Sequence, residues 1–164
     1  MSINYGKDLV IKNVNPDAKN IGDCVIRSFT SYFEDELTYE EIKNEILAIS
    51  KSYGSTNPHA YQRPIYFENF AKDANMVKIY VDNKKEFSTG NRLIKFCKKN
   101  KINAIGISNT HAAYVDYKVG LIDTWDSRRK HINYILINKD DALFIGAKPE
   151  DNGRFAREIE IFEF

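Results

Sequence analysis

The order of secondary-structure signals along the chain constrains its fold more than any other feature. Helical patterns fill most of the first hundred residues, and short β-type segments separated by turns follow from Ile102 onward. Helices are predicted to begin at or near four positions: Cys24, Thr38, Pro64 and the pair Ser88-Thr89. Helices followed by an antiparallel sheet predict an α+β domain.

The predicted strands are short and alternate between apolar and polar residues. They cover Val77–Val81, Ile102–Ser108, His111–Tyr117, Gly120–Trp125, Ile132–Asn138, Ala142–Ala147 and Glu158–Phe164, the last as an edge or near-edge strand. Residues 1–21 are expected to be irregular, with one apolar run at Leu9–Ile11. A chain of 164 residues with 43% apolar residues has the size and the core material of one domain, 1–164.

Charge and composition exclude several classes of function. The net charge is +1, from 24 basic and 23 acidic residues mixed along the chain, which argues against a nucleic-acid partner. No apolar run approaches the roughly 20 residues of a membrane span, and residues 1–12 lack the apolar centre of a secretory signal. Two cysteines are too few for a disulfide scaffold, so we expect a cytoplasmic protein or one delivered into a host cytosol.

Cys24 is the strongest candidate for chemistry. Gly22 permits a tight bend and Asp23 is a suitable N-cap, so Cys24 falls in the first turn of a helix. The helix dipole and the unpaired N–H groups at that position favour a thiolate and can hold an oxyanion. The alternative is a small buried hydrophobe, which is our interpretation of Cys97, on the apolar face of a later helix.

Of the three histidines, His111 is the best candidate for a general base. It opens the alternating segment that follows Asn109-Thr110, whereas His59 lies in a loop and His131 follows a basic run. No cluster of His and Cys has metal-ligand spacing, so neither a metal nor another cofactor is expected.

An acid is needed to orient the imidazole, and the returning strand offers Asp123 and Asp126. A two-residue turn at Lys118-Val119 would set His111 against Asp126, and a tighter return around Tyr117 would set it against Asp123. Trp125 lies beside either acid, where it either shields the His–Asp hydrogen bond or forms part of the core.

The order Cys24, His111, Asp123 resembles that of papain-like cysteine peptidases. Gly22-Asp23-Cys24 resembles the Asp-Cys segment of bacterial cell-wall endopeptidases and bacteriocin-processing peptidases, and Asp123-Thr124-Trp125 resembles the Asn-Ser-Trp segment of papain itself. The twelve-residue step from His111 to Asp123 is similar to that of the cell-wall enzymes and favours Asp123. The segment 111–127 also resembles small papain-like proteins of Gram-positive bacteria and their phages.

This resemblance implies N-terminal helices that carry the cysteine, packed on a C-terminal antiparallel sheet that carries base and acid. It also implies hydrolysis of a peptide, isopeptide or other amide through a thioester. The glutamine that such enzymes place about six residues before the cysteine is replaced by Ala18, which leaves Asn20 or Asn15 as oxyanion donors, and we expect Asn20. The alternatives are a transglutaminase-like or deamidating enzyme, which pairing with Asp126 would favour, and a non-catalytic binding or inhibitor protein.

Overall fold

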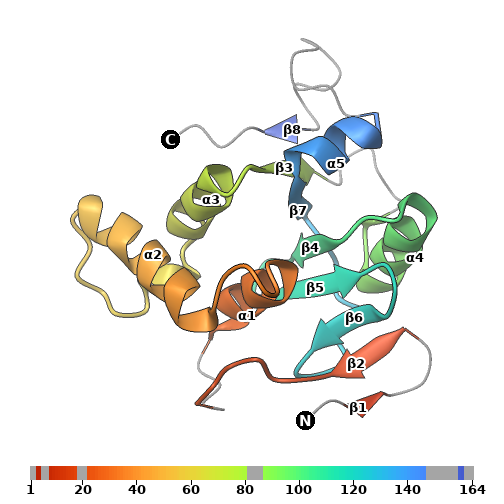
Figure 1. The fold of residues 1–164 in the computed structure, drawn as a ribbon, viewed down its shortest axis with the longest axis horizontal. Helices are drawn as coiled ribbons and strands as arrows, with labels where there is room; N and C mark the ends of the chain where they lie inside the picture. Colours follow the sequence, from red (N-terminus) through yellow and green to blue (C-terminus); the bar gives the residue numbers. More distant parts are fainter. Residues whose placement is uncertain (1–2, 5–7, 18–21, 81–86, 147–158, 161–164) are drawn as a thin grey trace.

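The computed structural model of the chain describes residues 3–4, 8–17, 22–80, 87–146 and 159–160, and these residues form an α+β fold (Figure 1). The helices are α1 (Cys24–Tyr32), α2 (Tyr39–Ser52), the short 3-10 helix η1 (Ala60–Gln62), α3 (Pro64–Asp73), α4 (Gly90–Asn100) and α5 (Lys139–Phe144). The strands are β1 (Ile3–Asn4), β2 (Leu9–Ile11), β3 (Met76–Tyr80), β4 (Ala104–Ile107), β5 (Ala112–Asp116), β6 (Gly120–Asp123), β7 (Tyr134–Asn138) and β8 (Ile159–Glu160).

The strands form one sheet in the order β1-β2-β6-β5-β4-β7-β3-β8. The predicted antiparallel pairing is confirmed for β4 with β5, β5 with β6, β4 with β7 and β3 with β7. The sheet is nevertheless mixed, because β2 pairs with β6 in parallel, with Leu9 opposite Leu121. The expectation that residues 1–21 are irregular is therefore wrong for the apolar run at 9–11, which gains a partner more than a hundred residues away.

The helix starts follow the local signals in the sequence. At α2, Thr38 accepts from the backbone N–H of Glu41 while the Glu41 side chain accepts from the N–H of Thr38, as a capping box requires. Pro64 occupies the first turn of α3, and the Thr89 side chain caps α4 by accepting from the N–H of Arg92. These three predicted helix starts are confirmed.

Helices cover both faces of the sheet, and the alternation of β4 shows how (Figure 1). Ile105 and Ile107 pack with α1, α2 and α3, whereas Ala104 belongs to the core that α4 covers on the other face. Gly106 also points towards α4, because a Cβ there would lie 3.1 Å from the Leu93 side chain. The sheet therefore lies between the first three helices and α4. Helix α1 packs against β5 and β4, in the middle of the sheet.

The end of the described chain differs from the prediction. Residues 142–147 were expected to form a strand, but α5 covers Lys139–Phe144. The helix forms because the Asn138 side chain accepts from the N–H of Asp140, and because Asp140 and Asp141 place negative charge in the first turn. The predicted strand 158–164 is seen as β8, an edge strand paired with β3, and its remaining residues lie outside the described part.

Among the residues that the structure describes, none of the helices combines the length and apolar character that a membrane crossing requires.

Candidate active site

Helix α1 begins at Cys24, as predicted, but its cap differs from the expectation. Gly22 has φ +58°, a left-handed conformation that suits glycine, and Asp23 occupies the N-cap position. The Asp23 side chain makes no capping hydrogen bond, because Oδ1 accepts instead from Nε of Arg27, one turn along the same helix, at 2.8 Å. The backbone N–H groups of the first turn therefore carry no side-chain cap from Asp23.

Cys24 and His111, far apart in the sequence, line one cleft of 320 Å³. Its lining includes apolar side chains, among them Val25 and Phe67, and polar side chains, among them Gln62 and Asn109. Apart from Cys24 and His111, the described residues that line this cleft carry no ionisable side chain. Cys24 is half-buried and is not in a disulfide, so its thiol has access to whatever enters the cleft.

His111 lies between the thiol and a carboxylate, directly before β5. Its Nε2 is 2.6 Å from Oδ2 of Asp123, which leaves Nδ1 as the ring nitrogen available to interact with the Cys24 thiol. Burial lowers the pKa of His111, but the hydrogen bonds and charges of Asp123 and Cys24 outweigh it and raise the pKa to about 9. The imidazole is therefore protonated at neutral pH, as the partner of a thiolate must be.

Asp123 ends β6 and is almost fully buried, with 4% of its surface exposed. Its Oδ2 accepts from His111 and from the Ser127 hydroxyl at 2.6 Å, and its Oδ1 accepts from the N–H of Thr124 at 2.7 Å. Burial raises the pKa of this carboxyl, but the hydrogen bonds from His111, Ser127 and Thr124 lower it below the usual value. The carboxylate is thus held ionised in a fixed orientation.

The hairpin register explains why Asp123, and not Asp126, meets the imidazole. Asp116 pairs with Gly120, so the turn contains three residues, 117–119, and both turns considered from the sequence are wrong. Continued along the hairpin, this register sets His111 opposite Trp125, and Asp123 then lies on the diagonal of the same face. Asp126 is exposed and binds Arg128 through both of its carboxylate oxygens.

Trp125 stands beside the imidazole, with the ring centroids 5.0 Å apart. The side chain is 44% exposed, so the alternative that it forms part of the core is wrong. Its indole is tilted by 48° to the His111 ring, and a role in shielding the His–Asp hydrogen bond stays a prediction.

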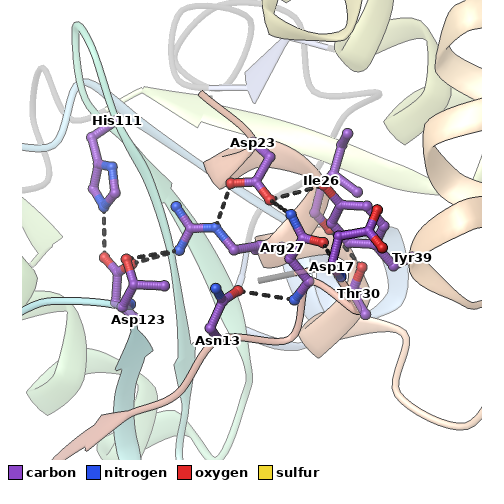
Figure 2. A network of polar contacts seen from close by, with 11 residues as sticks. Asn13, Asp17, Asp23, Ile26, Arg27, Thr30, Tyr39, His111 and Asp123 are labelled. Atoms are coloured by element: carbon purple, nitrogen blue, oxygen red, sulfur yellow. Dashed lines mark hydrogen bonds and ion pairs between the residues drawn. The ribbon is translucent and has the colours of Figure 1, made fainter. Parts of the chain in front are cut away.

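Arg27 is a member of the site that the sequence did not reveal (Figure 2). Its Nη1 lies 3.2 Å from Oδ1 of Asp123 and 3.1 Å from the Thr124 hydroxyl, while its Nε binds Asp23. Figure 2 shows these contacts as a continuous chain from His111 to Asp123, from Asp123 to Arg27 and from Arg27 to Asp23. A polar residue three positions after Cys24 is ordinary on an exposed helix face, so no local signal marks Arg27 as buried.

Gln62 is the second residue that the sequence analysis missed. An ideal Cβ on Gly22 would lie 2.1 Å from Nε2 of Gln62, so the amide nitrogen occupies the place that a side chain at position 22 would fill. Gln62 lines the cleft with Cys24, and no hydrogen bond joins its side-chain amide to the residues that the structure describes. The expected oxyanion donor, Asn20, lies outside the described residues, as does Ala18, while Asn15 donates to Asp23.

The remaining candidates lie away from the cleft. Cys97 is fully buried in the core under α4, as predicted, and burial raises the pKa of its thiol. His59 is exposed and contacts Tyr61, and His131 is exposed and forms an isolated bridge with Thr89.

Substitution of the two acids by asparagine separates their roles. Asp123→Asn should lower the pH at which His111 titrates by about one to three units, because the imidazolium loses its ionised partner inside a buried site. Asp126→Asn is the matched control and should leave the titration unchanged, because that carboxylate binds only Arg128 among the described residues. NMR titration of the histidine rings measures both. Equal effects of the two substitutions would contradict the assignment.

Comparison of the chain with protein-family models, curated proteins and solved structures gives no significant match.

Proposed function

We propose that this protein is a cysteine-dependent hydrolase that cleaves a peptide, isopeptide or other amide through a thioester. The observation that carries the proposal is the position of His111, which lines one cleft with Cys24 and has a ring nitrogen 2.6 Å from Asp123. A thiol, an imidazole and a carboxylate in contact at a cleft are the three groups that nucleophilic thiol catalysis needs. The attribution to the papain-like superfamily is part of this proposal and rests on the resemblance of the three segments.

The first half-reaction forms the thioester. The Cys24 sulfur attacks the substrate carbonyl carbon, and the electron pair of the C=O bond moves onto the oxygen. The Cys24 backbone N–H, which has no partner within the helix, and the Gln62 amide are placed to donate to that oxyanion. As the intermediate collapses, the C–N bond breaks and His111 gives its proton to the leaving amine.

The second half-reaction regenerates the thiol. His111, now neutral, takes a proton from a water molecule as the water oxygen attacks the thioester carbonyl. The C–S bond then breaks, the acid product leaves, and the sulfur departs as a thiolate beside the imidazolium that holds the proton from water, which restores the ion pair. Asp123 keeps Nε2 of His111 protonated throughout, so that Nδ1 is the nitrogen that exchanges protons.

The two alternatives are affected differently by the geometry. A transglutaminase-like or deamidating enzyme was favoured by pairing of His111 with Asp126, and that support is absent because Asp126 binds Arg128 instead. The other alternative, a non-catalytic binding protein on the same scaffold, is tested by the labelling experiment below. Both cysteines are free, which suits a cytoplasmic location.

Selective alkylation tests the proposal without a known substrate. Iodoacetamide at pH 6 should label the native protein once, at Cys24, because only a thiolate reacts at an appreciable rate. Cys24→Ala should abolish the labelling, and the matched variant Cys97→Ala should retain it, as measured by intact mass and peptide mapping. Equal labelling of the two cysteines, or none, would favour the binding protein.

A further inference from the structure

Arg27 is a buried charge that ties the nucleophile-bearing helix to the third residue of the site. Its side chain is 9% exposed, and those of Asp23 and Asp123 are 3% and 2% exposed. It is joined to Asp23 on α1 and to Asp123 and Thr124 at the end of β6, as Figure 2 shows. Burying an arginine is costly, so its position between two carboxylates needs a reason beyond the packing of α1.

Asp23 is held as firmly as Asp123. Its Oδ2 accepts from Nδ2 of Asn15 and from the Tyr39 hydroxyl of α2, both at 2.8 Å. Desolvation by burial and the hydrogen bond to Asp23 raise the pKa of Tyr39 well above its usual value, so that hydroxyl stays a donor. With Arg27 on Oδ1, the carboxylate of Asp23 is a fixed counter-ion one residue before Cys24.

The polar and charged groups around His111 come from the N-terminal end of α1, from β6 and from the segment that follows β6. Helix α1 contributes Cys24, and behind the carboxylate it contributes Arg27 and Asp23; β6 contributes Asp123; and after β6, Ser127 donates to the same carboxylate. The uncharged Trp125 ring covers one side, and Lys130 reaches the neighbouring Thr110 hydroxyl.

Arg27 and His111 compete for one carboxylate. Arg27 binds Oδ1 and His111 binds Oδ2 of Asp123, so two cations lie on opposite oxygens of the same group. Positive charge on Arg27 opposes positive charge on His111, while the ion pair with Asp23 offsets part of that opposition. The electrostatic potential at His111 therefore depends on the charges of Asp123, Arg27 and Asp23, and not on Asp123 alone.

We propose that Arg27 is a positioning residue that shares Asp123 with His111 and, together with its counter-ion Asp23, sets the upper pH at which the His111–Cys24 ion pair persists. The inference rests on the proposed function, because that pH limit matters only if the pair is catalytic. Its test uses a titration that can be read whether or not the protein hydrolyses anything.

The experiment compares two variants of the full chain by NMR titration of the His111 ring. Asp23→Asn keeps an acceptor for Arg27 but removes the counter-ion, so His111 should lose its proton about half a unit lower in pH than in the native protein. Asp23→Asn combined with Arg27→Met removes both charges, so relative to Asp23→Asn alone the titration should move up by about one unit. The double variant avoids leaving an unpaired buried carboxylate at position 23.

The inference depends on the direction in which the His111 titration moves between Asp23→Asn and the double variant. If Arg27 only holds Asp123 in place, its removal loosens the carboxylate, and the titration of His111 falls further or stays where Asp23→Asn put it; either result overturns the inference. If the double variant fails to fold, Asp23→Asn with Arg27→Gln, which keeps hydrogen-bond donors without the charge, should show the same upward shift. Absence of Cys24 labelling at pH 6 would instead count against the proposed function, and the two failures are thus distinguishable.

Discussion

Replacing His111 with alanine should reduce the alkylation rate of Cys24 at pH 6 by about 100-fold. Without His111, the proposed thiolate has no imidazolium beside it, and an ordinary cysteine thiol is only roughly 0.3% ionised at this pH. If the proposed function holds, the variant should also be unable to hydrolyse an amide, because the proton donor to the leaving amine is lost. Rates of iodoacetamide incorporation between pH 5 and 9 provide the measurement.

His131→Ala is the matched control for this experiment. That histidine is exposed and lies outside the residues that line the cleft, so its loss should change neither rate. The ion-pair assignment fails if His111→Ala keeps the labelling kinetics of the native protein. The fold of each variant can be verified by circular dichroism, and Cys24→Ala should also fold normally, because Cys24 is half-buried at a cleft and not in the core.

Replacing Gln62 with alanine should separate acyl transfer from thiol reactivity. Formation of an acyl-enzyme develops an oxyanion, and loss of one preorganised donor costs about 100- to 1,000-fold in rate. Alkylation by iodoacetamide develops no such charge, so its rate should stay the same. Release of p-nitrophenolate from p-nitrophenyl acetate reports the first reaction, and incorporation of iodoacetamide reports the second.

Asn109→Ala provides the control for Gln62. Asn109 also lines the cleft, and the hydrogen bond that its Oδ1 accepts from Asn133 fixes the orientation of its amide. Its loss should leave both rates within about twofold of the native values, as for a side chain that makes no contact specific to the transition state. If the Gln62→Ala variant is acylated at the native rate, Gln62 is not the oxyanion donor. Asn20→Ala would then test the donor expected from the sequence.

The elements that could be predicted from the sequence are those set by local chemistry. The capping box at Thr38 and Glu41, the proline that begins α3 and the Thr89 cap each depend on residues within one helical turn. Cys24 also begins a helix as predicted, although the Asp23 side chain does not cap that helix. The order of cysteine, histidine and acid is also visible in the chain, because no three-dimensional information is needed to state it.

The elements that could not be predicted depend on distant contacts. From the sequence, Arg27 would be an exposed helix residue, but it is buried because β6 places Asp123 beside it. Gln62 would be an ordinary loop residue, but η1 places its side chain against Gly22. The choice between Asp123 and Asp126 turned on a single residue of turn length, and a hydrophobic pattern cannot fix that. Residues 142–144, part of the predicted strand 142–147, belong instead to α5, which the Asn138 side chain caps.

The parallel pairing of β2 with β6 has a consequence for how this protein is made. The Leu121 N–H donates to the Asp8 carbonyl and the Lys12 N–H donates to the Asp123 carbonyl, so the strand that carries the acid is bordered by a segment synthesised well before it. That segment must wait for its β6 partner until more than a hundred further residues have been synthesised. The Cys24 thiol is therefore synthesised well before His111 and Asp123, the two groups proposed to activate it.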